Sequence, residues 1–218
     1  MVSQWWETVL DVIFPPRCPV CRKAVKTHGQ WCSTCLGEVW APRSLILAYH
    51  NLAFLDTCYT LCNYSKGVQS IIRSMKFRHL RRYGCYLSWL LSIAPSQQLE
   101  TFDIIIPVPL SSERLAARGY NQTEVIFRPW ANQQGFQWCD ILIRTQKTMP
   151  QWELTLKQRK SNIKGAFTVT HLEQIQGKEI LLVDDIFTTG TTMDECARVL
   201  KKAGAASVKG FVIASGAQ

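Results

Sequence analysis

The sequence has 218 residues, of which 47% are hydrophobic and 19% charged, and this composition excludes a disordered chain. The length allows one domain with a small addition, or two small domains. A formal net charge of +9 favours polyanionic partners such as nucleic acid or phosphorylated ligands. No apolar run is long enough to span a bilayer, and residues 1–10 lack the basic start of a secretory signal. We therefore expect a protein of the reducing cytoplasm, where paired cysteines indicate a metal before a disulfide.

Residues 4–14 are expected to form a short amphipathic helix. One helical stripe of this segment is apolar and consists of Trp5, Trp6, Val9, Leu10 and Ile13. Packing of this stripe onto the body is one interpretation, and an anchor for a partner or a membrane surface is the other. The acidic side chains of Glu7 and Asp11 argue against the membrane.

Two Cys-x-x-Cys pairs follow and predict a zinc site. The four expected ligands are Cys18, Cys21, Cys32 and Cys35. Four thiolates close a tetrahedral site and leave no position for water, which makes the site structural rather than catalytic. A module this small buries little core, so the metal would supply much of its folding free energy. Two disulfides or four idle thiols are the alternatives, and His28 could replace one thiolate.

Residues 36–56 include Pro42 and are expected to link this module irregularly to the main body. We place the domain boundary within this link. Residues 1–45 form the helix and zinc module, and residues 46–218 form the second domain. Residues 57–64 predict the first strand of that second domain.

The densest basic cluster of the chain accompanies a helix predicted for residues 67–77. Its candidate nucleic-acid-binding side chains are Arg73, Lys76, Arg78, Arg81 and Arg82. Tyr83, Tyr86 and Trp89 follow, and basic residues interleaved with aromatics suit single-stranded nucleic acid, whose bases stack on rings. The same aromatics could equally form the buried side of a helix over about residues 83–93.

A second buried strand is predicted for residues 102–110. Arg114 and Arg118 lie in a basic loop or short helix behind it. Residues 121–124 fit a capping box that begins another helix, and Pro129 should kink or end that helix early.

The remaining elements continue an alternation of strands and helices. Short strands at 140–144 and 166–170 flank a basic segment, 145–164, which is either a mobile loop over a cleft or an ordinary surface excursion. Residues 208–214 predict the last strand. This alternation predicts an α/β fold with a mainly parallel sheet.

The most informative stretch is 180–192. Residues 180–183 have the length of a strand buried on both faces, and they run into Asp184 and Asp185, whose charges must reach a cleft. A loop built for an oxyanion follows around one glycine. Its members are Thr188, Thr189, Gly190, Thr191 and Thr192.

This loop is expected to stand at the N-terminus of a helix. Thr192 and Glu195 fit a capping box, and Gly204 stops the helix. Backbone donors and the helix dipole favour phosphate at that end, while the preceding carboxylates suit a ribose diol. The stretch therefore predicts a sugar-phosphate site at the carboxyl end of a parallel sheet. An ordinary strand-to-helix turn is the alternative.

The stretch 180–192 resembles the motif by which type I phosphoribosyltransferases bind phosphoribosyl pyrophosphate (PRPP). Three further stretches narrow the resemblance. They are Ile106-Pro107-Val108-Pro109 followed by Arg114 and Arg118-Gly119-Tyr120-Asn121-Gln122, the run from Gln151 through Arg159 and Asn162 to Phe167, and the two cysteine pairs. From about residue 18 to its end, the chain resembles the ComF/ComFC family of phosphoribosyltransferase-like proteins. Pro129 departs from the usual pattern of that family.

The resemblance implies a sheet of the type I phosphoribosyltransferase type with a small N-terminal zinc-ribbon-like module. It also implies a cytoplasmic bacterial protein of natural transformation or DNA utilisation. Such a protein would handle imported single-stranded DNA alongside a helicase and recombination mediators.

The same resemblance implies roles for individual residues. Asp184 and Asp185 would bind ribose hydroxyls, directly or through Mg²⁺, and the loop 188–192 would hold the 5′-phosphate. The turn at Val108 and Pro109, with the two arginines beyond it, would face pyrophosphate.

Two functions stay open at this stage. In the first, the protein is a transferase that moves ribose phosphate from PRPP to an unknown base, as in nucleotide salvage. Its catalytic residues would be Asp184, Asp185, Arg114 and Arg118, which position the ligand and stabilise the leaving pyrophosphate. In the second, the protein binds PRPP or a nucleic-acid 5′-phosphate in the same cleft without turnover and contacts DNA.

Overall fold

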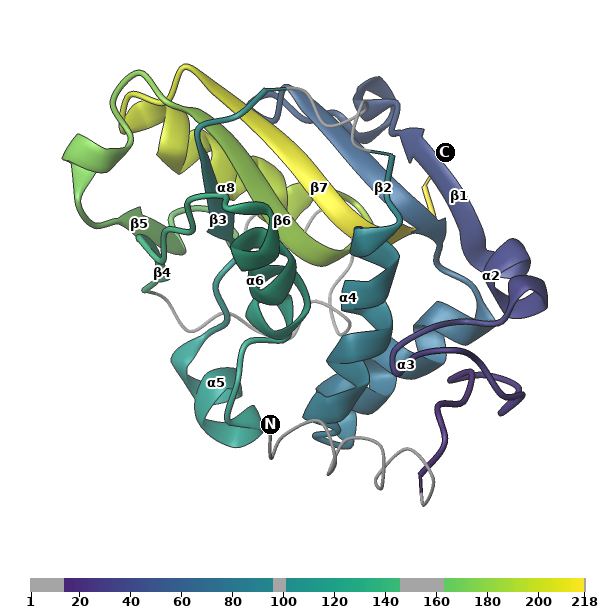
Figure 1. Ribbon diagram of the computed structural model, residues 1–218. Helices are drawn as coiled ribbons and strands as arrows, with labels where there is room; N and C mark the ends of the chain where they lie inside the picture. The colour runs from purple at the N-terminus through teal and green to yellow at the C-terminus, as the bar shows by residue number, and fades with distance from the viewer. Residues whose placement is uncertain (1–13, 96–100, 146–162, 218) are drawn as a thin grey trace.

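The computed structural model describes residues 14–95, 101–145 and 163–217, and its centre is a five-stranded sheet (Figure 1). The strand order is β1-β2-β7-β6-β3. The strands are β1 (Trp40–Ser44), β2 (Thr57–Asn63), β3 (Ile104–Pro107), β6 (Glu179–Phe187) and β7 (Ser207–Ser215). The last four of these run parallel, and only the edge strand β1 is antiparallel to its neighbour. The predicted mainly parallel sheet is confirmed.

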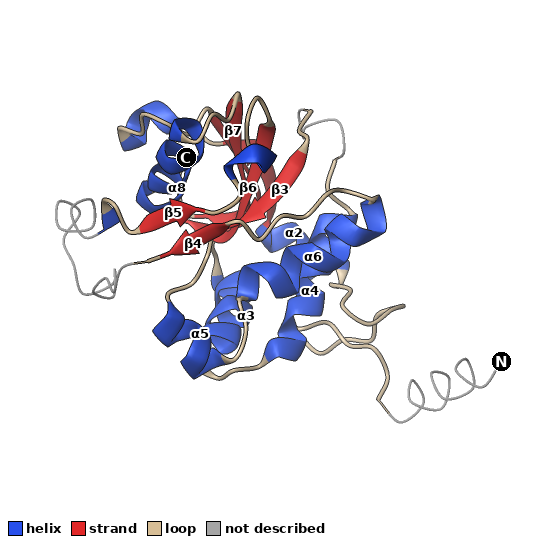
Figure 2. Ribbon diagram, turned by 90° about the vertical axis from the view of Figure 1, so that its left-hand side faces the viewer, coloured by secondary structure: helices blue, strands red, loops and turns tan. Residues whose placement is uncertain are grey.

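Helices cover both faces of this sheet (Figure 2). One face carries α3 (Lys66–Phe77), α4 (Gly84–Ser92) and α6 (Gln122–Gln134), and the other carries α8 (Thr191–Lys202). A hydrophobic core lies on each side of the sheet, and alternate residues of β6 pack into one core or the other. Leu181 and Val183 pack with the first group of helices, and Ile180 and Leu182 pack with α8. The central strand is therefore buried on both faces, as its apolar run predicts.

The smaller elements stand at the rim of this body. They are α2 (Ser33–Val39), α5 (Ser112–Arg118), the 3₁₀ turns η1 (Leu47–His50), η2 (Arg81–Tyr83) and η5 (Leu172–Gln174), and an antiparallel pair, β4 (Leu142–Arg144) with β5 (Phe167–Val169). The strands predicted near 140–144 and 166–170 thus exist, but they form a sheet of their own beside α8.

The link expected to be irregular at residues 36–56 contains regular structure. It includes the end of α2, all of β1 and η1. Pro42 lies in β1, where an edge strand tolerates a residue without an N–H group, and the register with β2 shifts between Trp40 and Arg43. Pairing with β2 makes residues 40–44 a strand, and the local sequence does not indicate that pairing.

The helix containing Pro129 is longer than predicted. α6 continues to Gln134 and ends at Gly135, whose φ is 72°. Pro129 is exposed, whereas Phe127, Trp130 and Ala131 are buried in the core. Burial of that face offsets the one backbone hydrogen bond that proline removes, so the helix does not end early.

The boundaries around residue 190 also differ from expectation. β6 does not end before the two aspartates but pairs with β7 as far as Phe187 opposite Ser215. α8 begins at Thr191 with Gly190 as its N-cap and no capping side chain. The predicted capping box is wrong because the Glu195 carboxylate accepts from the backbone N–H of Gly165, at 2.7 Å, and from Arg198.

The cysteine module packs directly on α3 and α4. The indole N–H of Trp31 donates to the carbonyl oxygen of Tyr86 at 2.9 Å, and Trp31 is 1% exposed. Gly67, in the first turn of α3, lies so close to Trp31 and Val20 that an added Cβ would be 3.2 Å from both side chains. The module therefore rests on the helices that flank the main sheet.

Two predictions concern segments outside the described residues. The amphipathic helix at 4–14 and the basic segment at 145–164 fall there almost entirely. Across the described residues, no helix combines the length and the apolar character that crossing a bilayer requires.

Candidate functional site

A pocket of about 500 Å³ opens at the carboxyl ends of β3 and β6. Its walls come from the end of α3, the turn after β3, α5, the end of β6 and the threonine loop that begins α8. This is the edge at which parallel α/β sheets bind ligands. The parallel register of β3 and β6 brings the segments around residues 108 and 184 together, although they are far apart in the sequence.

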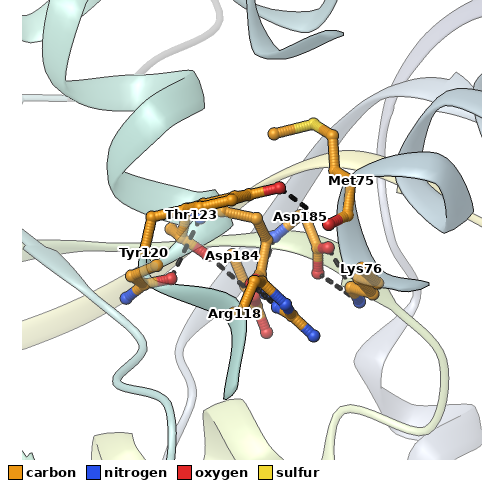
Figure 3. Close-up of polar contacts among 9 residues, drawn as sticks. Met75, Lys76, Arg118, Tyr120, Thr123, Asp184 and Asp185 are labelled. Atoms are coloured by element: carbon orange, nitrogen blue, oxygen red, sulfur yellow. Dashed lines mark hydrogen bonds and ion pairs between the residues drawn. The ribbon is translucent and has the colours of Figure 1, made fainter. Parts of the chain in front are cut away.

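Two carboxylates form one side of the pocket (Figure 3). Asp185 is 2% exposed, and Nζ of Lys76 lies 3.0 Å from its Oδ1 and 2.7 Å from its Oδ2. Oδ1 of Asp184 accepts from the hydroxyl of Thr123 at 3.2 Å and from the backbone N–H of Asp185 at 2.8 Å. The two acids are thus held by groups from α3 and α6.

Within the described part of the chain, Asp185 has an ion-pair partner and Asp184 has none. Burial, and secondly the neighbouring charge of Asp185, raise the pKa of Asp184 to about 7. The Lys76 ammonium acts in the opposite direction but does not cancel these effects. A carboxyl group whose ionisation is opposed inside a pocket is typical of a functional site.

The threonine loop forms another wall of the pocket and needs glycine at its centre. Gly190 has a φ of 73°, and a Cβ there would stand 2.5 Å from Cδ1 of Leu52 and 2.5 Å from Cζ of Phe187. The hydroxyls of Thr189 and Thr191 lie 2.9 Å apart. All five residues of the predicted loop line the pocket beside the N-terminus of α8, where backbone donors and the helix dipole favour an anion.

The third wall carries the predicted pyrophosphate-facing residues. Val108, Pro109, Arg114 and Arg118 all line the pocket. The guanidinium of Arg118 donates to the side-chain oxygen of Gln122, and burial lowers the pKa of Arg118 while Asp185 opposes that shift. The pocket is lined by more basic side chains than acids, so its charge suits a polyanionic ligand. Besides the two aspartates, the lining contains Arg73, Lys76, Arg114, Arg118 and Arg144.

The five candidate nucleic-acid-binding residues do not lie at a single site in the structure. Arg73 and Lys76 line the pocket, and Arg73 also lines a neighbouring groove together with Arg78. Arg81 and Arg82 lie in η2. The aromatics after them, Tyr83, Tyr86 and Trp89, pack against the core, which favours the interpretation as the buried side of α4.

Sequence reasoning missed the side chains that hold the two acids in place. The sequence predicts Lys76 only as a nucleic-acid contact, because its partner Asp185 is 109 positions away and no local pattern joins them. Thr123 directly follows the Arg-Gly-x-Asn-Gln stretch and could have been included with it. Tyr120 in that stretch donates its hydroxyl to the carbonyl oxygen of Met75 at 2.7 Å, which fixes the stretch against α3 (Figure 3).

The four predicted zinc ligands are gathered at one point. The sulfur atoms of Cys18, Cys21, Cys32 and Cys35 all lie within 4.8 Å of one another, and His28 is not part of the group. All nine cysteines lie in the described residues, and each is a free thiol. Burial disfavours the Cys18 thiolate, but backbone N–H groups in both Cys-x-x-Cys pairs lower the pKa of Cys18 to about 6. A closed set of four sulfurs fits structural zinc.

Comparison with known proteins agrees with both parts of this description. Residues 132–218 match a phosphoribosyl transferase domain, and residues 9–45 match a double zinc ribbon domain. The DNA utilization protein YhgH of Salmonella typhimurium is 30% identical over 200 residues, which cover 88% of this chain and 87% of that protein. Competence protein F of Haemophilus influenzae is 28% identical over 206 residues, which cover 89% and 82% of the two chains.

A more distant relative is competence protein ComFC of Bacillus subtilis, 28% identical over 207 residues covering 90% of this chain and 76% of that one. Among solved structures, an allosteric regulatory enzyme of purine biosynthesis aligns with a TM-score of 0.37 and 23% identity. That alignment covers 62% of this chain but only 25% of the enzyme.

Fold, pocket and cysteine cluster together define a phosphoribosyltransferase-like α/β protein with an N-terminal zinc-ribbon module. Within that class, the chain belongs to the ComF family of competence and DNA-utilisation proteins.

Proposed function

We propose that the protein binds PRPP, or a closely related phosphoribosyl ligand, and acts in the uptake and utilisation of DNA in the cytoplasm. The observation that carries this proposal is the convergence of two carboxylates, a threonine loop and two arginines on one pocket. The names of its relatives support the DNA-related role. A helicase and recombination mediators of competence are the expected partners.

Each part of the ligand has a matching wall. The diol of the ribose faces Asp184 and Asp185, and the 5′-phosphate lies in the loop 188–192 at the N-terminus of α8. The pyrophosphate faces Arg114 and Arg118, whose planar guanidinium groups suit phosphate oxygens. The proposed domain of residues 46–218 carries this pocket, and the described part of the preceding module, residues 14–45, packs on α3 and α4.

The pocket also suits Mg²⁺ bound together with the ligand. Among the described residues, the hydrogen bonds of Asp184 come from a hydroxyl and a backbone N–H rather than from a cation, and the positive charge of an ion would favour its ionised form. Mg²⁺ prefers phosphate oxygens with one or two carboxylates, so Asp184 would hold it, directly or through water. The bound ion would neutralise charge on the pyrophosphate.

Contact with single-stranded DNA is the second half of the proposal. The basic lining and the net charge of +9 support it. The affinity for an oligodeoxynucleotide should fall steeply as salt rises, because phosphate contacts release counterions. An affinity independent of salt would remove this part of the proposal.

A second candidate function is a transferase that releases pyrophosphate from PRPP. The placement of Arg114 and Arg118 in the same pocket as the two acids favours it, because these cations would stabilise the leaving group. Pyrophosphate release in the presence of candidate bases separates the two functions. Turnover that the Asp184→Asn variant abolishes would establish the transferase, and binding without release would establish the ligand-binding module.

The loop offers a direct test of the phosphate site. PRPP with Mg²⁺ should raise the unfolding temperature of the wild-type protein, because a ligand that binds only the folded state stabilises it. Thr191→Val removes one hydroxyl at nearly constant volume and should reduce that rise, whereas Thr168→Val, on the exposed side of β5, should not. Equal rises in both variants would contradict the assigned phosphate position.

A further inference from the structure

A second concave surface lies beside the pocket on the exposed face of α3. This α3 groove has a volume of about 420 Å³, and its lining includes three cations, Lys66, Arg73 and Arg78. The sequence of α3, Lys66–Phe77, contains no acidic residue. The α3 groove therefore presents positive charge that no acid on its own helix neutralises, and charge of this kind suits a polyanion.

An aromatic ring stands at the end of the same groove. Phe77 is 65% exposed, although it belongs to a helix whose other face is packed into the core. Polar side chains of Gln69 and Ser70 complete the lining. Cations along a groove with an exposed ring suit single-stranded nucleic acid, since phosphates pair with the charges and a base stacks on the ring.

The α3 groove and the pocket are not independent, because they share two side chains. Arg73 and Phe77 line both. Between them on the helix, Lys76 is bound to Asp185 on the pocket side. A strand in the groove and a phosphosugar in the pocket would therefore meet at Arg73, within the range over which charges interact at physiological salt.

We propose that the α3 groove binds single-stranded nucleic acid and that the strand and the phosphosugar oppose each other's binding through Arg73. The inference rests on the proposed function of the pocket. One guanidinium cannot serve two polyanions fully, and the two bound anions repel each other. By thermodynamic linkage, each ligand weakens the other by the same factor.

The composition of the lining favours a nucleic-acid strand over an anionic membrane surface. A membrane-bound helix needs a broad apolar face beside its cations, whereas Phe77 is the one apolar side chain among the described residues that line this groove. A flexible strand can place its phosphates at the cations and stack a base on that ring. Under this proposal, a rise in phosphosugar concentration releases the strand.

Fluorescence anisotropy with a 3′-labelled, unphosphorylated oligodeoxythymidine of about 20 nucleotides measures the strand affinity. Saturating PRPP with Mg²⁺ should weaken this affinity about fivefold or more, and the oligonucleotide should weaken PRPP binding by the same factor. Arg73→Ala should reduce the mutual effect below about twofold. Lys202→Ala is the matched control, since it removes one exposed cation from α8 on the other face of the sheet.

Two further variants locate the strand. Phe77→Leu should weaken oligonucleotide binding about fivefold or more without changing its salt dependence, because the loss is one of stacking. Arg78→Ala should reduce the slope of log affinity against log salt by about one. Unchanged strand affinity in both variants would overturn the α3 groove as the binding surface.

The remaining outcomes distinguish this inference from the proposed function. If PRPP and the oligonucleotide both bind but neither affects the other, the coupling is overturned and the proposed function stands. If PRPP alone fails to bind, the proposed function and the coupling are overturned together. If phosphatidylserine vesicles bind and Arg78→Ala weakens them but not the oligonucleotide, the groove is a lipid site and the inference is wrong.

Discussion

At the scale of single residues, the burial of Asp184 beside a second carboxylate costs stability. Burial and the charge of Asp185 raise its pKa to about 7, so the folded protein holds a proton that the unfolded chain has released. Between the unfolded pKa near 4 and the folded pKa near 7, the folded state binds more protons. Stability from this group therefore falls as pH rises through that window, and the full deficit is present above it.

Asp184→Asn should remove this deficit while keeping the oxygen that accepts from Thr123 and from the Asp185 N–H. We expect the free energy of unfolding to rise by about 1–3 kcal/mol at pH 8 and by less than about 1 kcal/mol at pH 4. Urea unfolding at the two pH values measures both. The control variant Asp140→Asn, at an exposed acid, should change the free energy of unfolding by less than about 0.5 kcal/mol at either pH. Equal effects of Asp184→Asn at pH 4 and pH 8 would show that its ionisation is not opposed.

Gly190 is the second residue whose identity the site demands. Gly190→Ala combines a left-handed backbone with a Cβ 2.5 Å from Leu52 and Phe187, so we expect a loss of about 3 kcal/mol or more. Gly135→Ala is the matched control, because its φ is 72° and the space around its Cβ is open. That variant should lose only about 1 kcal/mol. Similar losses in the two variants, measured by urea unfolding, would mean that the close contacts of Gly190 carry no cost.

At the scale of elements, packing overrides a local signal in α6. Pro129 removes one helical N–H on the exposed side, while Phe127 and Trp130 hold the helix in the core. Pro129→Ala should restore the missing hydrogen bond and raise the free energy of unfolding by about 1 kcal/mol or more. Chemical denaturation measures this change, and a loss of stability would mean that proline's restriction of the unfolded chain matters more than the hydrogen bond.

Predictions of elements were right where the signal was local and wrong where distant partners decided. The strands at β2, β3, β6 and β7 and the helices α3 and α4 follow from apolar runs and helical periodicity. β1 depends on β2 for its pairing, and β6 extends to Phe187 because β7 accompanies it. The start of α8 is set by Gly190 rather than by a capping side chain, because Glu195 is recruited by Gly165 and Arg198.

The candidate site shows the same contrast between residues predicted from local sequence and residues placed by distant partners. Asp184, Asp185 and the threonine loop are contiguous in sequence, so a motif could predict that they lie together. Lys76 and Thr123 reach the acids only through the packing of α3 and α6 against β6, which no pattern in the sequence encodes. For that reason the sequence predicts Lys76 as a nucleic-acid contact, whereas in the structure its ammonium group pairs with Asp185.

At the scale of the whole molecule, the zinc module and the pocket share α3. The Cys18→Ser variant should lose its zinc and unfold the module, since the metal supplies much of the folding free energy of so small a unit. Zinc content by mass spectrometry and the fluorescence of Trp31, which is buried against α4, measure the two losses. Cys85→Ser, at an exposed thiol outside the cluster, should keep both. A full zinc content in Cys18→Ser would contradict the assigned ligand set.

The central claim is that the pocket holds a phosphorylated pentose between two acids and a threonine loop. Calorimetric titration of the wild-type protein and of the Asp184→Asn/Asp185→Asn double variant with PRPP and Mg²⁺ tests it most directly. We predict saturable binding of one PRPP per chain in the wild type and at least about a tenfold loss of affinity in the double variant. An absence of binding heat in the wild type over a range of temperatures, or equal affinity in the double variant, would contradict the claim.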